Sequence, residues 1–189
     1  MYGFNEQPFR PLDGYYDNYN INKDLYSNNK IFFNNLSSNL KNKINIKILD
    51  NSKNKVVSNS CKKLYKTKNF INEKKDYAKI LNKYNMIVHF YLGTPFFESM
   101  FYNKPSILIL NEKFQHHFDL NFKNLINNFK RVNICFDSPI KASKFVNDNF
   151  KNLEDWWNDS KVQSVRNKFC DLYCRNFQYT DDFKNLFIK

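Results

Sequence analysis

The sequence predicts an α/β fold: a three-layer, Rossmann-like domain in which helices cover both faces of a parallel sheet of about four or five strands, with a helical C-terminus. Two short apolar runs, residues 86–91 and 106–110, have the length and composition of strands that are buried on both faces. A helix-forming stretch separates them, and a strand–helix–strand unit of this kind builds a parallel sheet. Apolar residues at helical spacing recur through the C-terminal part of the chain.

The N-terminal part divides into an irregular segment and the start of the domain. Residues 1–29 are polar, rich in Asn and Tyr and interrupted by Pro8, Pro11 and Gly14, so we expect no regular structure there. The Rossmann-like domain is expected over residues 30–189. Alternation of Ile44, Ile46 and Ile48 with polar residues predicts a strand with one covered face. A helix before it is predicted by apolar side chains at helical spacing, which are Ile31, Phe32, Leu36 and Leu40.

The middle of the chain carries the most informative unit. A loop or weak helix over residues 50–69 and a short amphipathic helix over residues 77–84 lead to the first apolar run. A turn then breaks that run. In this turn Thr94 is a good helix N-cap, and Pro95 suits the first helical position because its missing N–H costs nothing there. The helix that follows is expected to reach Asn103.

The C-terminal part is expected to be mainly helical. Residues 118–129 suit a helix, and alternating apolar residues over 132–136 predict a last strand. Ser138 is expected to cap a further helix that runs to about Phe150. Residues 152–189 are predicted to be helical throughout.

The composition excludes several classes of protein. A hydrophobic content of 42% with 25% charged residues excludes a disordered chain. The net charge of +12 comes mostly from lysines spread along the chain, and A/T-rich codons produce this composition, so we expect no nucleic-acid partner. A weak attraction to the anionic inner face of a membrane stays open. Because neither a signal peptide nor a membrane-spanning apolar run is visible, the chain is expected to be soluble and cytoplasmic.

The sequence predicts neither a metal site nor a cofactor. Its four cysteines contain no C-x-x-C pair and are expected to be reduced thiols. Cys170 and Cys174, four residues apart on a predicted helix, could hold half a metal site, but no second pair of ligands accompanies them. The adjacent His116 and His117 do not form a chelating pair, and the glycine-rich motifs of P-loop and dinucleotide-binding proteins are absent.

The turn after the first apolar run is the candidate ligand site. Where a parallel strand ends and a helix begins, backbone N–H groups and the helix dipole point into the crevice beyond the sheet, and a phosphate can be held there without a lysine. Gly93 would let a ligand approach the backbone, and the Thr94 hydroxyl could cap the helix or donate to an anion. Pro95, Glu98 and Ser99 complete the candidate phosphate- and ligand-binding element. The alternative is a plain helix start with an N-cap.

Other residues allow two interpretations each. Glu98 could accept hydrogen bonds from ribose hydroxyls or could favour the helix dipole on a solvated face. His89 and Tyr91 lie toward the carboxyl end of the strand, where the histidine is either a catalytic base or a satisfied, partly buried residue. The pair Trp156–Trp157 is either a sugar-stacking platform or a packing anchor. Arg166 faces either an acidic partner or solvent.

Two stretches of the chain match a known pattern. Residues 137–170 contain the double tryptophan followed by Val162-Gln163, Arg166 and Phe169-Cys170, and residues 93–105 contain a Thr-x-x-x-Glu element followed by Asn-x-Pro. In these stretches the chain resembles a family of surface-polysaccharide transferases of the GT-B glycosyltransferase type. The resemblance covers residues 85–175 well and residues 30–84 weakly.

The resemblance implies half of a GT-B fold, a cytoplasmic enzyme and a nucleotide-activated sugar as donor, with Gly93 and Thr94 facing the donor phosphates and Glu98 the ribose or sugar. A GT-B enzyme needs two such domains, so the resemblance also implies a missing N-terminal domain and a glycan or lipid-linked acceptor. The catalytic residues stay unknown. Two alternatives stay open: a polyol-phosphate transferase of the teichoic-acid-like kind, and a non-catalytic nucleotide-sugar-binding module.

Overall fold

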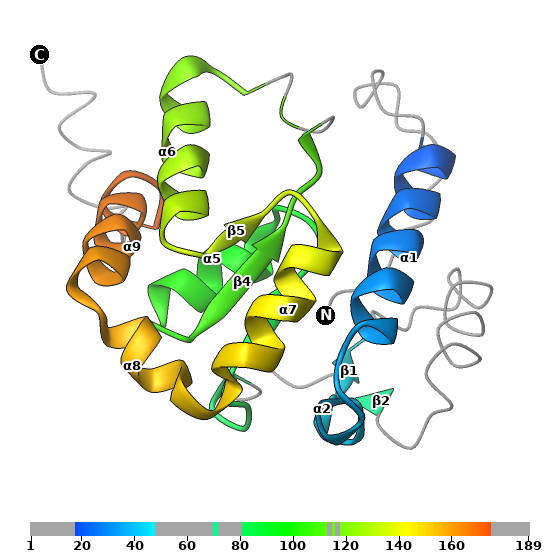
Figure 1. Ribbon diagram of the computed structural model, residues 1–189. Coiled ribbons are helices and arrows are strands. Elements are labelled where there is room, and N and C mark those ends of the chain that lie inside the picture. The colour runs from blue at the N-terminus through cyan, green and yellow to red at the C-terminus, as the bar shows by residue number, and fades with distance from the viewer. Residues whose placement is uncertain (1–17, 48–69, 72–80, 113–114, 116–117, 175–189) are drawn as a thin grey trace, which may run out of the picture.

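A parallel sheet of three strands forms the centre of the computed structural model. The strands are β3 (Ile87–His89), β4 (Ser106–Ile109) and β5 (Cys135–Phe136), with β4 in the middle (Figure 1). The two apolar runs of the sequence therefore lie side by side, which confirms the predicted parallel pairing. The structure describes residues 18–47, 70–71, 81–112, 115 and 118–174.

Helices make up most of the remaining described chain. They are α1 (Asn18–Asn34), α2 (Ser38–Lys43), α5 (Thr94–Phe101), α6 (Leu120–Arg131), α7 (Pro139–Asn149), the 3-10 helix η3 (Phe150–Asn152), α8 (Leu153–Asn158) and α9 (Ser160–Tyr173). A second parallel pair joins β1 (Ile46–Lys47) to β2 (Phe70–Ile71). The sequence predicts β1 but not β2. The predictions for residues 50–69, and the first half of the predicted helix over 77–84, lie outside the described residues; of the second half, Leu81 is helical and residues 82–84 form a turn and its exit.

The main sheet has three strands in the described part of the chain, whereas the sequence predicts about four or five in one sheet. β5 is also shorter than the predicted strand over residues 132–136. The reason is that α6 continues to Arg131, Val132 forms its C-cap, and Asn133 then takes a positive φ of 61°. Only after this turn does the backbone become extended.

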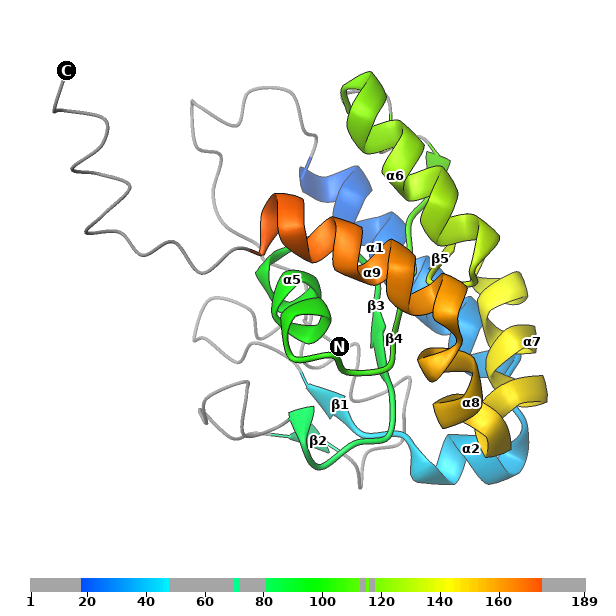
Figure 2. The ribbon, with the colours of Figure 1, turned by 90° about the vertical axis from the view of Figure 1, so that its left-hand side faces the viewer.

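Different helices cover the two faces of the sheet, as a three-layer domain requires. Along β4, Ile107 and Ile109 belong to the core shared with α1 and α7, whereas Leu108 and Leu110 belong to the core shared with α5, α6 and α9. The same division of the helices is visible in two perpendicular views (Figures 1 and 2). Burial on both faces explains why this strand is continuously apolar in the sequence.

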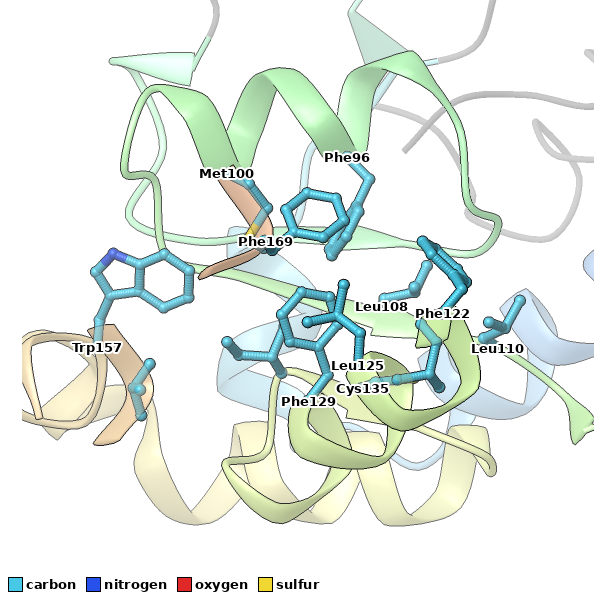
Figure 3. Packing of buried hydrophobic residues seen from close by; sticks show 13 residues of the cluster. Phe96, Met100, Leu108, Leu110, Phe122, Leu125, Phe129, Cys135, Trp157 and Phe169 are labelled. Atoms are coloured by element: carbon cyan, nitrogen blue, oxygen red, sulfur yellow. The ribbon is translucent and has the colours of Figure 1, made fainter. Parts of the chain in front are cut away.

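Aromatic rings fill the layer between the sheet and the helices α5, α6 and α9 (Figure 3). The Phe96 ring of α5 meets Phe129 of α6 and Phe169 of α9 edge to face, with centroids 5.9 and 5.7 Å apart. All three side chains are fully buried. Each such ring pair adds roughly 0.5–1.5 kcal/mol beyond the burial of area. This packing fixes the position of α5, and with it the turn at which that helix begins.

The N-terminal helix begins earlier than predicted, and the single helix predicted through Ile31, Phe32, Leu36 and Leu40 is interrupted between α1 and α2. α1 begins at Asn18, so the expectation of an irregular segment over residues 1–29 is wrong for residues 18–29, while residues 1–17 lie outside the described part. Tertiary packing overrides the weak local signal, because Phe32 is buried under the sheet and α1 lies along α7. The Asn147 side chain of α7 accepts from the Ser37 N–H and donates to the Asn35 carbonyl, both at 2.9 Å.

The C-terminal region is not one continuous helix. It breaks at Asp159, whose carboxylate accepts a hydrogen bond from the Lys161 N–H at 2.9 Å and so caps α9. The predicted helical residues 175–189 lie outside the described part. By contrast, Ser138 caps α7 as predicted, with its hydroxyl 3.3 Å from the Ile140 N–H. Among the described residues, no helix is long and apolar enough to cross a membrane.

Candidate functional site

The candidate site is the turn that joins β3 to α5 at the carboxyl edge of the sheet. The N-cap of α5 is Gly93, not Thr94 as predicted, because Gly93 is the residue with extended backbone (φ −159°, ψ 175°) and its carbonyl accepts from the Phe96 N–H at 2.8 Å. Thr94 is therefore the first helical residue and is exposed, and Pro95 is the second. Since Gly93 has no side chain, the N-cap residue itself offers no side-chain oxygen to the first-turn amides.

The Tyr91 ring lies against the α-carbon of Gly93. A β-carbon at position 93 would run into the Cε2 atom of that ring. The glycine is thus explained by the close approach of a side chain of the protein itself, which the sequence did not indicate. Tyr91 is half-buried, and desolvation raises its pKa to about 12, so the phenol keeps its proton and remains a hydrogen-bond donor at neutral pH.

His89 and Ser99 form a buried link between β3 and α5. The Ser99 hydroxyl donates to the Pro95 carbonyl at 2.8 Å, so its oxygen accepts from the Nε2–H of His89 at 3.1 Å. The two side chains are 3% and 0% exposed. Burial lowers the pKa of His89 well below its usual value and keeps the imidazole neutral. The interpretation of His89 as a satisfied buried residue is supported over that of a catalytic base.

The structure thus divides the predicted site residues into two groups. Gly93 and Thr94 lie at the accessible start of α5, with Tyr91 beside them and the half-buried Glu98 one turn further along. The other group, which is buried, consists of His89, Pro95 and Ser99. A ligand at this turn would meet the first group, while the second group holds the helix on the sheet.

A protein-family model, that of the LIC12162 family transferase, matches residues 10–184, which is most of the chain. The chain belongs to the LIC12162 transferase family. It is therefore a transferase, in agreement with the transferase character that the double-tryptophan stretch predicts. No curated protein and no solved structure matches the chain significantly.

The two tryptophans of this transferase are packing anchors. The Trp157 indole N–H reaches both the carbonyl and the side-chain oxygen of Asn103, at 3.0 and 2.9 Å, and its ring is 2% exposed. The Trp156 indole donates to the Val132 carbonyl at 3.0 Å. Both rings therefore tie α8 to the turns that precede β4 and β5, and the sugar-stacking interpretation is not supported for Trp157.

Arg166 has a role that sequence reasoning missed. Its guanidinium donates to the carbonyls of Met100 and Phe101, at 2.7 and 3.1 Å, and so satisfies the C-terminal end of α5. The distance in sequence is 66 residues, so no local pattern could have indicated it. The only available signal was an arginine on an amphipathic helix, which fits many surroundings.

A groove of about 390 Å³ lies at the open edge of β5, away from the candidate turn. It runs between β5 and the helices α6 and α7, and its charged residues are Lys130, Asp137, Lys141, Lys144 and Asp148. Two of these lysines form ion pairs, one from Lys141 to Asp137 at 3.1 Å and one from Lys130 to Glu112 at 3.6 Å. Among the described residues β5 is an edge strand, and lysines beside an edge strand discourage pairing with other chains. Within the described residues, no group of three His, Cys, Asp or Glu side chains could hold a metal ion.

Proposed function

We propose that this protein is the donor-binding, C-terminal part of a glycosyltransferase-like enzyme of surface polysaccharide biosynthesis, with GT-B architecture and a cytoplasmic location. The observation that carries the proposal is the start of α5. A helix N-terminus stands at the carboxyl edge of a parallel sheet, has a glycine as its N-cap, and presents an exposed threonine in its first turn. Membership in a transferase family supports the proposal.

The donor phosphates would be held by the first turn of α5. Pro95 has no N–H, so the donors near the phosphate are the Thr94 amide and hydroxyl, aided by the positive end of the helix dipole. The Tyr91 phenol, which is neutral, adds a further donor beside Gly93. Glu98 lies one turn further along, where its carboxylate would accept from a ribose or sugar hydroxyl. No cofactor is required for binding of this kind.

The same arrangement would assist transfer. When the sugar leaves the nucleotide, negative charge grows on the departing phosphate, and the fixed dipoles at the start of α5 stabilise that charge without reorganising. The acceptor, a glycan or a lipid-linked glycan, would be bound by an N-terminal domain. That domain would also supply the catalytic base. Within this chain we assign binding roles only.

Thermal-shift titration of the full chain with nucleotide sugars that differ in base and sugar tests the proposal. One class is expected to raise the melting temperature, since a ligand at a hundred times its Kd stabilises by about 2.7 kcal/mol. Thr94→Ala should weaken that binding about tenfold or more, because a charge-assisted hydrogen bond is lost. Ser160→Ala is the matched control, since Ser160 is the exposed first residue of α9 as Thr94 is of α5.

Each outcome of these titrations either supports the proposal or overturns it. Stabilisation by one class of nucleotide sugar, reduced in Thr94→Ala and kept in Ser160→Ala, supports the proposal. Stabilisation by nucleotide-activated polyols alone would replace it with a polyol-phosphate transferase. No stabilisation by any of these ligands, or an equal loss in both variants, would overturn donor binding at this turn.

A further inference from the structure

The last turn of α9 carries two thiols that the proposed function does not use. Cys170 and Cys174 lie four residues apart on one face of the helix, both half-buried and both free. Their side chains interact, and the interaction shifts the pKa values of the two thiols in opposite directions. Cys135, by contrast, is 2% exposed in the core. The pair is therefore accessible to small reagents, whereas Cys135 is sealed from them.

The second thiol also contacts α5. The Cys174 sulfur lies 3.6 Å from the Phe97 carbonyl oxygen and donates to it. α9 lies alongside α5 (Figure 2), so this contact and the Arg166 guanidinium bind the same two helices at different levels. The thiol contact is the nearer of the two to the first turn of α5.

We propose that Cys170 and Cys174 form an oxidation site that closes into an intrahelical disulfide and thereby releases the contact between α9 and α5. A hydroperoxide is the oxidant. The Cys170 thiolate attacks its O–O bond, takes one oxygen as a sulfenic acid and expels hydroxide or alkoxide. The Cys174 sulfur then attacks the sulfenic sulfur, the S–S bond forms as the S–O bond breaks, and the hydroxyl leaves with the Cys174 proton as water.

The surroundings of Cys170 favour it as the attacking sulfur. The hydrogen bond from Cys174 lowers the Cys170 pKa to about 7, with Arg166 one turn away acting in the same direction. The same hydrogen bond raises the pKa of Cys174, which therefore keeps its proton until it resolves the sulfenic acid. Because Cys174 has one proton, it donates either to the Phe97 carbonyl or to the Cys170 thiolate.

The backbone allows the bond to close at this end of the helix. Side chains four residues apart on a helix have β-carbons about 5–6 Å apart, and a disulfide needs about 3.5–4.5 Å. Cys174 is the C-cap of α9, with φ −118° and ψ 15°, so it can shift without breaking the interior of the helix. In the disulfide the Cys174 sulfur has no proton, and its hydrogen bond to Phe97 is lost.

Peroxide treatment of the full chain near neutral pH tests the oxidation site. The fourth cysteine of the sequence, Cys61, is replaced by serine (Cys61→Ser) so that it cannot react. Trypsin cleaves after Lys168 and Arg175 and leaves both cysteines in one peptide, residues 169–175. We expect that peptide to lose two hydrogens and to resist alkylation, at a rate at least about a hundredfold above oxidation of Cys135. In Cys174→Ser the peptide should gain oxygen instead. A peptide that stays fully alkylated, or that gains oxygen with Cys174 present, would overturn the disulfide.

Hydrogen exchange across α5 tests the coupling. Oxidation should speed exchange there by about two- to fivefold, which corresponds to a net hydrogen bond of about 0.5–1 kcal/mol. Cys174→Ala should produce the same change without oxidant and should not respond to peroxide. Unchanged exchange in both cases would show that the sulfur contact does not hold α5. Neither outcome depends on donor binding, so the inference and the proposed function can fail separately.

Discussion

The two ends of α5 differ in how the protein satisfies their backbone groups. At its C-terminal end, protein donors satisfy the backbone: Arg166 binds the carbonyls of Met100 and Phe101, and Trp157 binds Asn103 in the turn that follows. At its N-terminal end, the N-cap is a glycine, and the first helical residue, Thr94, is exposed. The same helix is therefore closed by the protein at one end and open at the other.

The difference shows what each end contributes. The closed end binds α5 to α8 and α9 and should matter for stability, because indole and guanidinium donors there are partly or fully removed from water. The open end keeps the positive end of the helix dipole accessible at the carboxyl edge of the sheet. Substitutions at the closed end should therefore destabilise the protein, and those at the open end should change ligand binding.

The largest effect is expected at Trp157. Trp157→Ala should lower the free energy of unfolding by about 3–5 kcal/mol, because it leaves a cavity in the core and removes the donor to Asn103. Urea denaturation with fluorescence or circular dichroism measures it. Trp157→Phe keeps a six-membered aromatic ring but loses the indole N–H and the volume of the five-membered ring, so its loss of stability should be clearly smaller than that of Trp157→Ala. Equal losses would mean that the hydrogen bond, not the packing, closes this end.

A smaller loss is expected at Arg166. Arg166→Gln should cost about 1.5–3 kcal/mol, since two carbonyls at the end of α5 lose a charged donor. Lys168→Gln, an exposed change on the same helix, is the control and should have almost no effect. Equal stability of the two variants in urea titrations would refute the assignment of Arg166 as the cap of α5.

The buried link between His89 of β3 and Ser99 of α5 predicts that stability depends on pH. Burial lowers the His89 pKa in the folded protein, whereas the unfolded chain titrates near 6.5, so below that pH the unfolded chain binds a proton that the folded protein does not. Stability present above pH 6.5 should therefore fall as the pH is lowered, by up to about 1.4 kcal/mol per pH unit. Urea titrations between pH 7.5 and 5 measure this slope. His89→Asn removes the proton that only the unfolded chain binds, so the slope of stability against pH should decrease by up to about 1.4 kcal/mol per pH unit. An unchanged slope would contradict the role of burial.

The sequence locates the open end of α5 much better than the closed end. The Gly93-Thr94-Pro95 turn predicts the helix start to within one residue, because cap and proline preferences are local. Trp157 and Arg166 act across 54 and 66 residues, and only the fold brings them to α5. The same limit explains why α1 was predicted too short, since its packing on α7 is tertiary.

In the candidate site, too, the sequence predicts some features and misses others. The turn, the buried histidine and the packing role of the tryptophans follow from residue types and apolar context. The sequence did not indicate that Ser99 points into the core, because a serine in the second turn of a helix is compatible with either face. The approach of Tyr91 to Gly93 was also hidden, since two residues within a turn can lie in many relative orientations.

The smallest effect tests why position 93 is a glycine. Gly93→Ala should reduce stability by about 1 kcal/mol, because the new β-carbon displaces the Tyr91 ring and overpacking of this kind costs about 1–3 kcal/mol. The backbone conformation at position 93 is open to alanine, since φ is −159°. Alanine there should stabilise the protein by about 0.4–1 kcal/mol, because it makes the unfolded chain less flexible. In a Tyr91→Ala background the loss should therefore largely disappear, because the gain from the unfolded chain offsets the preference of an N-cap for glycine over alanine. Chemical denaturation of the four proteins in this cycle measures the difference, and a loss that persists in full without the ring would mean that the backbone at the open end of α5 requires glycine for another reason.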